Sequence, residues 1–196
     1  MEKRKIYAWL FLILILGIGL RFYDLNAESL WTDEMVSLMH TQKNSPLELV
    51  ISVTNMELMP PGYFLILNQW INYFGNSEFS LRFLSAFFDS FSILLVFLIA
   101  TKLFNRKVGL ISSLLLATTM LQIVYAQEAR PYSLFGFLVL LSTYLLILAF
   151  DSKNTSKKYL FFFYSLTIGF SLYVNYMTIF LIILHFMFLF FLKKNK

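Results

Sequence analysis

The sequence predicts an all-α integral membrane protein with about six transmembrane helices and a long first exoplasmic loop that carries amphipathic surface helices. The 196 residues are 59% hydrophobic and only 14% charged, with a mean hydropathy of +0.70. A soluble domain of this length has too small a core to bury so much apolar surface, so the bilayer must solvate it. The apolar residues also gather in runs long enough to cross a membrane, which takes about 20 residues.

Six apolar runs meet that length, and we treat 1–196 as one transmembrane domain. They are 6–22, 83–102, 109–126, 133–150, 159–175 and 177–192. The first run follows a basic start, as in a signal peptide, but no small-x-small cleavage site comes after it, so we expect an uncleaved span. The last two runs are almost contiguous and predict a helical hairpin with a tight turn near Asn175.

The charges between these runs are asymmetric. Of the 16 basic residues, 12 lie at the two termini and in the loops 102–107 and 153–158, and 8 of the 11 acidic residues lie on the other side. Basic loops stay in the cytoplasm. We therefore expect a multi-pass protein of the plasma membrane with a cytoplasmic N-terminus and an exoplasmic loop 23–82. On this reading the net charge of +5 reflects membrane orientation, and no nucleic-acid partner is expected. The absence of cysteine excludes disulfides and thiolate sites.

Two helices are expected in the loop 23–82, both lying along the membrane surface. The segment "DEMVSLMH" has apolar residues at helical spacing, and Thr32 or Asp33 could cap its N-terminus. The segment "PPGYFLILNQWINYFG" begins with prolines and ends with Gly75, which are common helix start and stop signals. Three aromatic residues of this second helix are expected at the membrane interface: Tyr63, Trp70 and Tyr73.

Three polar segments converge on the exoplasmic side. They are "LWTDEMVSL" with Asp33 and Glu34, "ELMPPGY", and "YAQEARPY" with Glu128 and Arg130. The last is a short loop, so Glu128 and Arg130 must lie at the rim of the helix bundle, near the first loop. A carboxylate beside a carboxylate–arginine pair would form a small polar site at the bilayer surface, which suits a substrate that is itself half lipid.

Structural explanations exist for each of these residues taken alone. An acidic pair at a helix start is favourable for the helix dipole, and Glu128 and Arg130 could form an ion pair in a turn. The two histidines, His40 and His185, have no partner at ligand spacing and are interpreted as structural. Asp89 lies inside the second span, where a charge is costly, so we expect it to face the bundle, either protonated or paired with an outer arginine.

The order of four segments resembles the GT-C superfamily of polyprenyl-phosphate-sugar-dependent glycosyltransferases, in particular the protein mannosyltransferases and the aminoarabinose transferase. The segments are "SLWTDEMVSL", "MPPGYFLILNQWINYFGNSEFSLRFLSAFF", "LFNRKVGLISSLLLA" and "YAQEARPYSL". The resemblance runs from Arg21 to Phe150 and extends weakly to "LYVNYMTIFL". Members of the superfamily are usually longer, so the resemblance implies the N-terminal part of a larger architecture.

The resemblance implies roles for individual residues. Asp33 matches the catalytic base of the first outer loop, and Glu128 matches a second catalytic carboxylate. The expected substrate-binding residues are Glu34, Arg82, Arg130, Tyr132, Tyr63 and Asn175. Two positions depart from related sequences, which often carry histidine where this chain has Met59 and Asn175. Asp33 and Glu34 could ligate a divalent metal, but no third ligand is fixed by spacing, so the metal stays unknown.

The implied activity is inverting transfer of a sugar from a polyprenyl-phosphate donor to a hydroxyl of a glycan, lipid or protein acceptor. Other interpretations remain open from the residues alone. They are a glycosidase-like hydrolase that uses Asp33 and Glu128, a transporter of lipid-linked sugars, and a non-catalytic truncated paralogue or scaffold. A subunit of a split glycosyltransferase, completed by a partner, is a further alternative.

Overall fold

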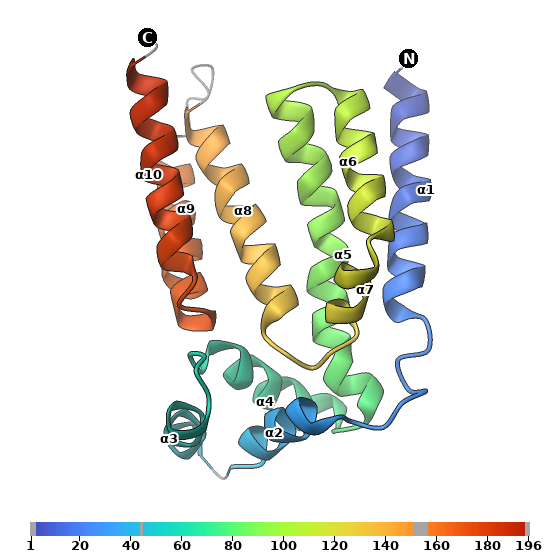
Figure 1. Cartoon of the computed structure of the whole chain (residues 1–196), viewed down its shortest axis with the longest axis vertical. Helices are drawn as coiled ribbons and strands as arrows, with labels where there is room; N and C mark the ends of the chain where they lie inside the picture. The colour runs from blue at the N-terminus through green and yellow to red at the C-terminus, as the bar shows by residue number, and fades with distance from the viewer. Residues whose placement is uncertain (1–2, 44, 151–156, 195–196) are drawn as a thin grey trace.

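The computed structural model describes residues 3–43, 45–150 and 157–194, and this part of the chain is helical without any strand. Figure 1 shows the helices, which are α1 (Lys3–Phe22), α2 (Thr32–Thr41), α3 (Pro46–Met56), α4 (Gly62–Phe74), α5 (Glu78–Leu103), α6 (Arg106–Thr118), α7 (Met120–Ala126), α8 (Tyr132–Phe150), α9 (Lys157–Val174) and α10 (Thr178–Lys194). The all-α prediction is confirmed for these residues.

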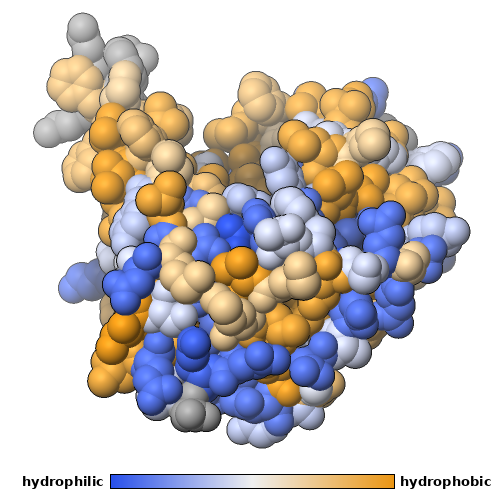
Figure 2. Space-filling model, turned by 60° about the horizontal axis from the view of Figure 1, so that its bottom comes forward, coloured by the Kyte–Doolittle hydropathy of each residue, from blue (hydrophilic) through white to orange (hydrophobic). Residues whose placement is uncertain are grey.

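The long helices run between two ends of the molecule. Both chain termini lie at one end, and the short helices α2, α3 and α4 lie across the other (Figure 1). Helix α5 packs against α1 and α6 on one side and against α8 on the other, and α8 in turn packs against α9. Figure 2 turns the α2–α4 end toward the viewer and shows hydrophilic residues gathered over it, interrupted by apolar patches. A polar functional site is therefore expected at the α2–α4 end.

Among the described residues, three helices are long and apolar enough to cross a membrane: α1, α5 and α8. Counting α6 and α7 as one bent span gives a fourth. Helices α9 and α10 form the expected hairpin, joined by a turn that contains Asn175. Six spans and the layout of the loops around them stay a prediction.

The predicted span 109–126 is not one straight helix. It breaks at Thr119, which has an extended backbone, and α6 and α7 meet at an angle of 61°. Thr118 and Thr119 donate their hydroxyls to carbonyls of the preceding turn, at 2.9 and 2.6 Å, and such back-bonding bends helices. Arg21 of α1 donates to the carbonyls of Leu116 and Ala117 at 3.2 and 3.1 Å, so groups freed by the break keep partners.

Arg21 also pairs with Asp89, which answers the question that the sequence left open. Both side chains are fully buried, and the Asp89 carboxylate accepts from Arg21 Nε and from the Gln122 amide of α7. An intramembrane acid is therefore paired with an outer arginine, one of the two expected arrangements. His185 likewise fits its structural interpretation, since its ring nitrogens lie 3.1 Å from Thr143 of α8 and 3.1 Å from Tyr164 of α9.

The segment between α1 and α5 holds three helices where the sequence predicted two. The missed helix, α3, begins at a recognisable signal: Ser45 accepts from the Glu48 backbone at 3.2 Å, with Pro46 in the first turn. Capping of α2 by Thr32 or Asp33 is wrong. The N-cap is Trp31, whose backbone N–H donates to Glu34 at 3.4 Å. That these helices lie along the membrane surface stays a prediction.

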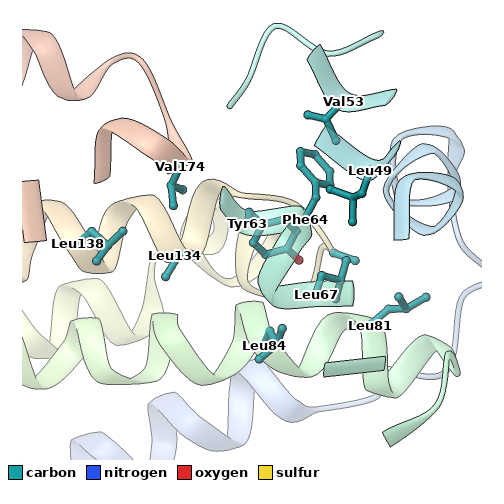
Figure 3. Close-up of a cluster of buried hydrophobic side chains, with 11 residues drawn as sticks. Leu49, Val53, Tyr63, Phe64, Leu67, Leu81, Leu84, Leu134, Leu138 and Val174 are labelled. Atoms are coloured by element: carbon teal, nitrogen blue, oxygen red, sulfur yellow. The ribbon is translucent and has the colours of Figure 1, made fainter. Parts of the chain in front are cut away.

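Helix α3 packs against α4 and buries part of its surface. Leu49 and Val53 of α3 pack with Tyr63 and Phe64 of α4 in a core that also takes side chains from α5, α8 and the end of α9 (Figure 3). Tyr63 is fully buried there, so its prediction as an interfacial aromatic is wrong. A second apolar core joins α1, α5 and α6. The first core holds the α2–α4 end against the long helices, and the second joins the long helices to one another.

Candidate functional site

Glu34 is the centre of the polar end of the bundle. The side chain is fully buried, and its carboxylate accepts from Arg82 of α5 at 2.9 Å (Nε) and 2.7 Å (Nη2). Its Oε1 also accepts from the Ala129 backbone N–H at 2.8 Å. One carboxylate thus ties α2 to α5 and to the loop after α7, three segments that are far apart in the sequence.

Arg82 uses all of its N–H groups inside the protein. Besides the two bonds to Glu34, its guanidinium donates to the carbonyls of Leu25 and Glu28, both at 2.8 Å, and of Ser29 at 3.3 Å. A guanidinium has five N–H donors, and these five bonds occupy them. The geometry therefore favours a positioning role for Arg82, which shapes the α1–α2 connection, over the direct substrate contact expected from the sequence.

Arg130 makes a second, parallel pair with Glu57. The two groups are bidentate, at 2.7 Å (Nη1–Oε1) and 3.2 Å (Nη2–Oε2), a strong arrangement for these ions. Arg130 also donates to the Asp33 carbonyl at 3.4 Å, and its Nη2 lies 4.0 Å from the Asp33 carboxylate. Burial alone would lower the pKa of Arg130, but the hydrogen-bonded carboxylate of Glu57 and the Tyr132 hydroxyl together outweigh it and raise the pKa. The buried Nε is unused within the described structure.

Glu57 and its neighbour His40 were not assigned to the site from the sequence. His40 Nδ1 bonds Ser52 Oγ at 2.9 Å, while Nε2 lies 4.0 Å from Glu57 and has no hydrogen bond in the described ranges. Burial lowers the pKa of His40, against the attraction of Glu57. Glu57 lies in the segment "ELMPPGY", which was already expected to converge on the site, and an acid without a nearby basic residue was the available signal.

Asp33 and Glu128 differ from the other two carboxylates. Across the described ranges, neither side-chain carboxylate accepts a hydrogen bond, and the closest cation to Asp33 is Arg130 at 4.0 Å. The Asp33 side chain is 44% exposed. Burial raises the pKa of Glu128, and the negative charges of Glu34 and Asp33 raise it further, against the opposing effect of Arg130. The cluster therefore has two neutralised carboxylates and two that are free to act.

Glu128 opens onto a cavity of about 500 Å³ between the α1–α2 connection, α5 and α7. Its volume lies within the ~300–1,000 Å³ range of small-molecule sites. The cavity is lined by Tyr23, Asp24, Leu25, Ala27, Glu28, Trp31, Glu34, Arg82, Val124, Gln127 and Glu128. Asp33 is not among the lining residues and lies on the Arg130 side of the cluster.

Two of the other expected site residues border this cluster: Tyr132 lies against Arg130, and Tyr63 bonds Ser85, whose hydroxyl donates to the Arg130 carbonyl at 3.3 Å. Tyr63 is buried in the apolar core with its hydroxyl 3.3 Å from Ser85, and burial raises its pKa. Its contact with substrate stays a prediction. Tyr132 begins α8 and packs against Tyr125, with ring centroids 5.0 Å apart. Asn175 accepts from the Met177 backbone at 2.9 Å in the α9–α10 turn. Substrate contacts by Tyr132 and Asn175 stay predictions.

The residues present do not form an evident metal site. No group of three or more histidine, aspartate or glutamate side chains within the described ranges is arranged to hold an ion. The Asp33–Glu34 pair does not converge on one point either, because Glu34 is turned inward to Arg82.

Comparison with known proteins identifies the family. The family model described as dolichyl-phosphate-mannose-protein mannosyltransferase matches residues 59–196, which include Arg82, Glu128 and Arg130. A protein from Aquifex aeolicus (strain VF5), described as "Uncharacterized protein", is 31% identical over 156 residues, which is 76% of this chain and 31% of that protein. The chain thus spans about a third of that relative's length. No solved structure matches the chain. Because the family model covers more than half of the sequence, the chain belongs to the dolichyl-phosphate-mannose-protein mannosyltransferase family.

Proposed function

We propose that the chain carries the catalytic end of a membrane glycosyltransferase that moves a sugar from a polyprenyl-phosphate donor to an acceptor hydroxyl. The observation that carries the proposal is the division of four clustered carboxylates into two arginine-bound and two unbound groups beside a cavity. Family membership supplies the reaction class, and this division supplies groups for the chemistry.

The reaction places its main demand on the acceptor. The acceptor oxygen attacks the anomeric carbon as the bond from that carbon to the phosphate oxygen breaks, and polyprenyl phosphate leaves with the electron pair. A phosphate is a good leaving group and needs no general acid, only nearby positive charge or N–H donors. The acceptor hydroxyl must lose its proton during the attack, and a positioned carboxylate typically contributes about 10²–10⁴-fold as general base. Direct displacement inverts the anomeric centre.

In this proposal Asp33 takes the acceptor proton. It is partly exposed, carries no hydrogen bond to its carboxylate within the described residues, and is held through its backbone by Arg130. Glu128 orients the acceptor at the cavity wall. Arg130 is a better candidate than Arg82 for the donor phosphate, since it lies beside Asp33, whereas all five N–H groups of Arg82 are bound to Glu34 and to backbone carbonyls. Arg82 and Glu34 position the loop around these groups.

We place this end of the molecule on the exoplasmic side of the cytoplasmic membrane. The support is the charge asymmetry: the end with both termini carries most of the basic residues, and the α2–α4 end carries most of the acids. Lipid-linked donors reach such a site from the bilayer, and acceptor glycans, lipids or proteins reach it from outside. The remainder of a longer chain, or a partner subunit, would complete the donor site.

A membrane-fraction assay with a panel of polyprenyl-phosphate sugars tests this function. We expect a new glycosidic bond of inverted configuration with the wild-type protein and a loss of about 10²–10⁴-fold with Asp33→Asn. The matched control is Glu48→Gln, which neutralises an exposed acid of α3 in the same loop. Release of free sugar alone would indicate a hydrolase. Movement of the lipid without bond formation would indicate a transporter, and no turnover with any donor would favour a scaffold.

A further inference from the structure

The cavity beside Glu128 has walls whose chemistry differs from that of a phosphate site. Four carboxylate residues contribute to its lining, Asp24, Glu28, Glu34 and Glu128, and the cation among the lining residues is Arg82. Phosphate sites need N–H donors or positive charge directed at the ligand. The charge of these walls is instead negative on balance, which repels the phosphate of a lipid-linked donor.

Arg82 does not offset this charge for a ligand. Its N–H groups are all bound to Glu34 and to three backbone carbonyls of the α1–α2 connection. The side chain is also buried. A phosphate in the cavity would have to break several of these bonds to gain one, so Arg82 stabilises the wall and does not bind an anion in the cavity.

The remaining walls favour a sugar ring. Tyr23 and Trp31 line the cavity and are 74% and 48% exposed, so aromatic surface is available to a ligand. The C–H groups on the face of a pyranose carry partial positive charge, and an aromatic face carries partial negative charge. Sugar hydroxyls in turn donate hydrogen bonds to carboxylates, which act only as acceptors. Aromatic faces beside carboxylate oxygens thus match both parts of a neutral saccharide.

The wall is also held in shape before any ligand arrives. The Gln127 amide donates to the carbonyls of Leu20, Arg21 and Tyr23, at 3.1, 3.4 and 2.9 Å, and fixes the end of α1 against α7. Together with the Arg82 bonds, this fixes both ends of the α1–α2 connection. Preorganised walls reduce the entropy lost on binding.

We propose that this cavity is the acceptor subsite and that it takes a sugar unit of an uncharged saccharide, while the donor phosphate binds outside it, on the Arg130 side of Asp33. The inference rests on the proposed function and names its acceptor class. The ring lies against Trp31 or Tyr23, and one of its hydroxyls donates to Glu128. This bond orients the ring so that a different hydroxyl, the one that attacks, faces the cluster that contains Asp33 and gives its proton to Asp33.

Direct binding without donor tests the inference independently of catalysis. The probes are neutral di- and trisaccharides, with inorganic phosphate and a sugar phosphate as anionic counterparts, titrated calorimetrically against the full chain in detergent. We expect saturable binding of at least one neutral saccharide, no competition by phosphate, and a Kd about tenfold weaker in Trp31→Ala and in Tyr23→Ala. The control is Trp70→Phe, which alters an aromatic residue stacked on Phe83, away from the cavity lining.

The outcomes separate the two proposals. Tighter binding of phosphate than of any neutral saccharide would overturn the inference, and so would no binding of any neutral probe or equal binding by all four proteins. Melting curves check that Trp31→Ala and Tyr23→Ala are folded, and both residues are exposed enough to tolerate the change. Saccharide binding without sugar transfer from any donor would contradict the proposed function, and with it the acceptor role of the cavity, while leaving the saccharide site itself in place.

Discussion

Replacing Arg82 by methionine should destabilise the protein more than any surface change in the same loop. Methionine keeps much of the side-chain volume but removes the guanidinium, its two bonds to Glu34 and its three bonds to carbonyls of the α1–α2 connection. Glu34 is fully buried, so its charge stays in the interior with the Ala129 N–H as its main remaining partner.

The magnitude follows from that isolated charge. Removing one partner of a buried ion pair costs about 3–5 kcal/mol, because the other charge stays desolvated and unpaired. For a chain of this length, each kcal/mol shifts the melting temperature by roughly 2–4 °C. The Arg82→Met protein should therefore melt roughly 6–20 °C below the wild type. Adding Glu34→Gln removes the unpaired charge, so the double variant should lose less than the sum of the two single losses.

Thermal unfolding in detergent, followed by circular dichroism, measures these differences. Glu48→Gln serves as the control and should melt within a few degrees of the wild type, since it changes an exposed side chain. The reasoning is refuted if Arg82→Met melts with the control, or if the double variant loses the full sum. Either result would mean that the Glu34–Arg82 pair does not hold the loop.

Three further predictions concern other parts of the structure. A Cβ on Gly62 would lie 2.5 Å from a backbone carbonyl of α9, so Gly62→Ala should lower the free energy of unfolding by about 1–3 kcal/mol. A Cβ on Gly136 meets nothing within 4 Å, so Gly136→Ala should raise the free energy of unfolding by about 0.5–1 kcal/mol. Melting curves of both variants check this contrast. Asp89→Asn leaves a buried arginine without its counter-charge and should cost about 3–5 kcal/mol by the same measurement, and a loss under 1 kcal/mol would contradict the pairing. The pKa of Glu128 is raised above its ordinary value near 4.5, so the folded state binds this proton more tightly than the unfolded state. Relative to Glu128→Gln, the wild type should therefore lose stability as pH rises above about 4.5, which melting curves of both proteins across that range would measure, and equal pH slopes would argue against the shift.

The fold class could be predicted from the sequence because membrane-spanning helices are recognisable by their length and hydropathy. Helices α1, α5 and α8 match predicted spans, and the hairpin turn at Asn175 is where the run of apolar residues pauses. The break at Thr119 was missed since hydropathy does not register it. The break depends on hydroxyl back-bonding and on Arg21, which lies 96 residues away from Ala117 in sequence.

The segments that form the site could be predicted from the sequence, but the ion pairs between their charged residues could not. Asp33, Glu34, Glu128 and Arg130 were expected at one site, and they do lie in one cluster. Which carboxylate binds which arginine depends on side-chain direction: Glu34 points inward to Arg82, whereas Asp33, one position earlier, stays partly exposed. The burial of α4 also depends on α3, a short helix that was not predicted from the sequence.

The most direct test of the central claim is the ratio of sugar-transfer rates between Asp33→Asn and Glu48→Gln at equal protein in the membrane. Both variants remove one negative charge from the same loop, but only Asp33 is proposed to take the acceptor proton. The account predicts a rate about 10²–10⁴-fold lower for Asp33→Asn, with Glu48→Gln close to the wild type. Equal rates for the two variants would contradict it, because the transfer would then proceed without Asp33 as general base.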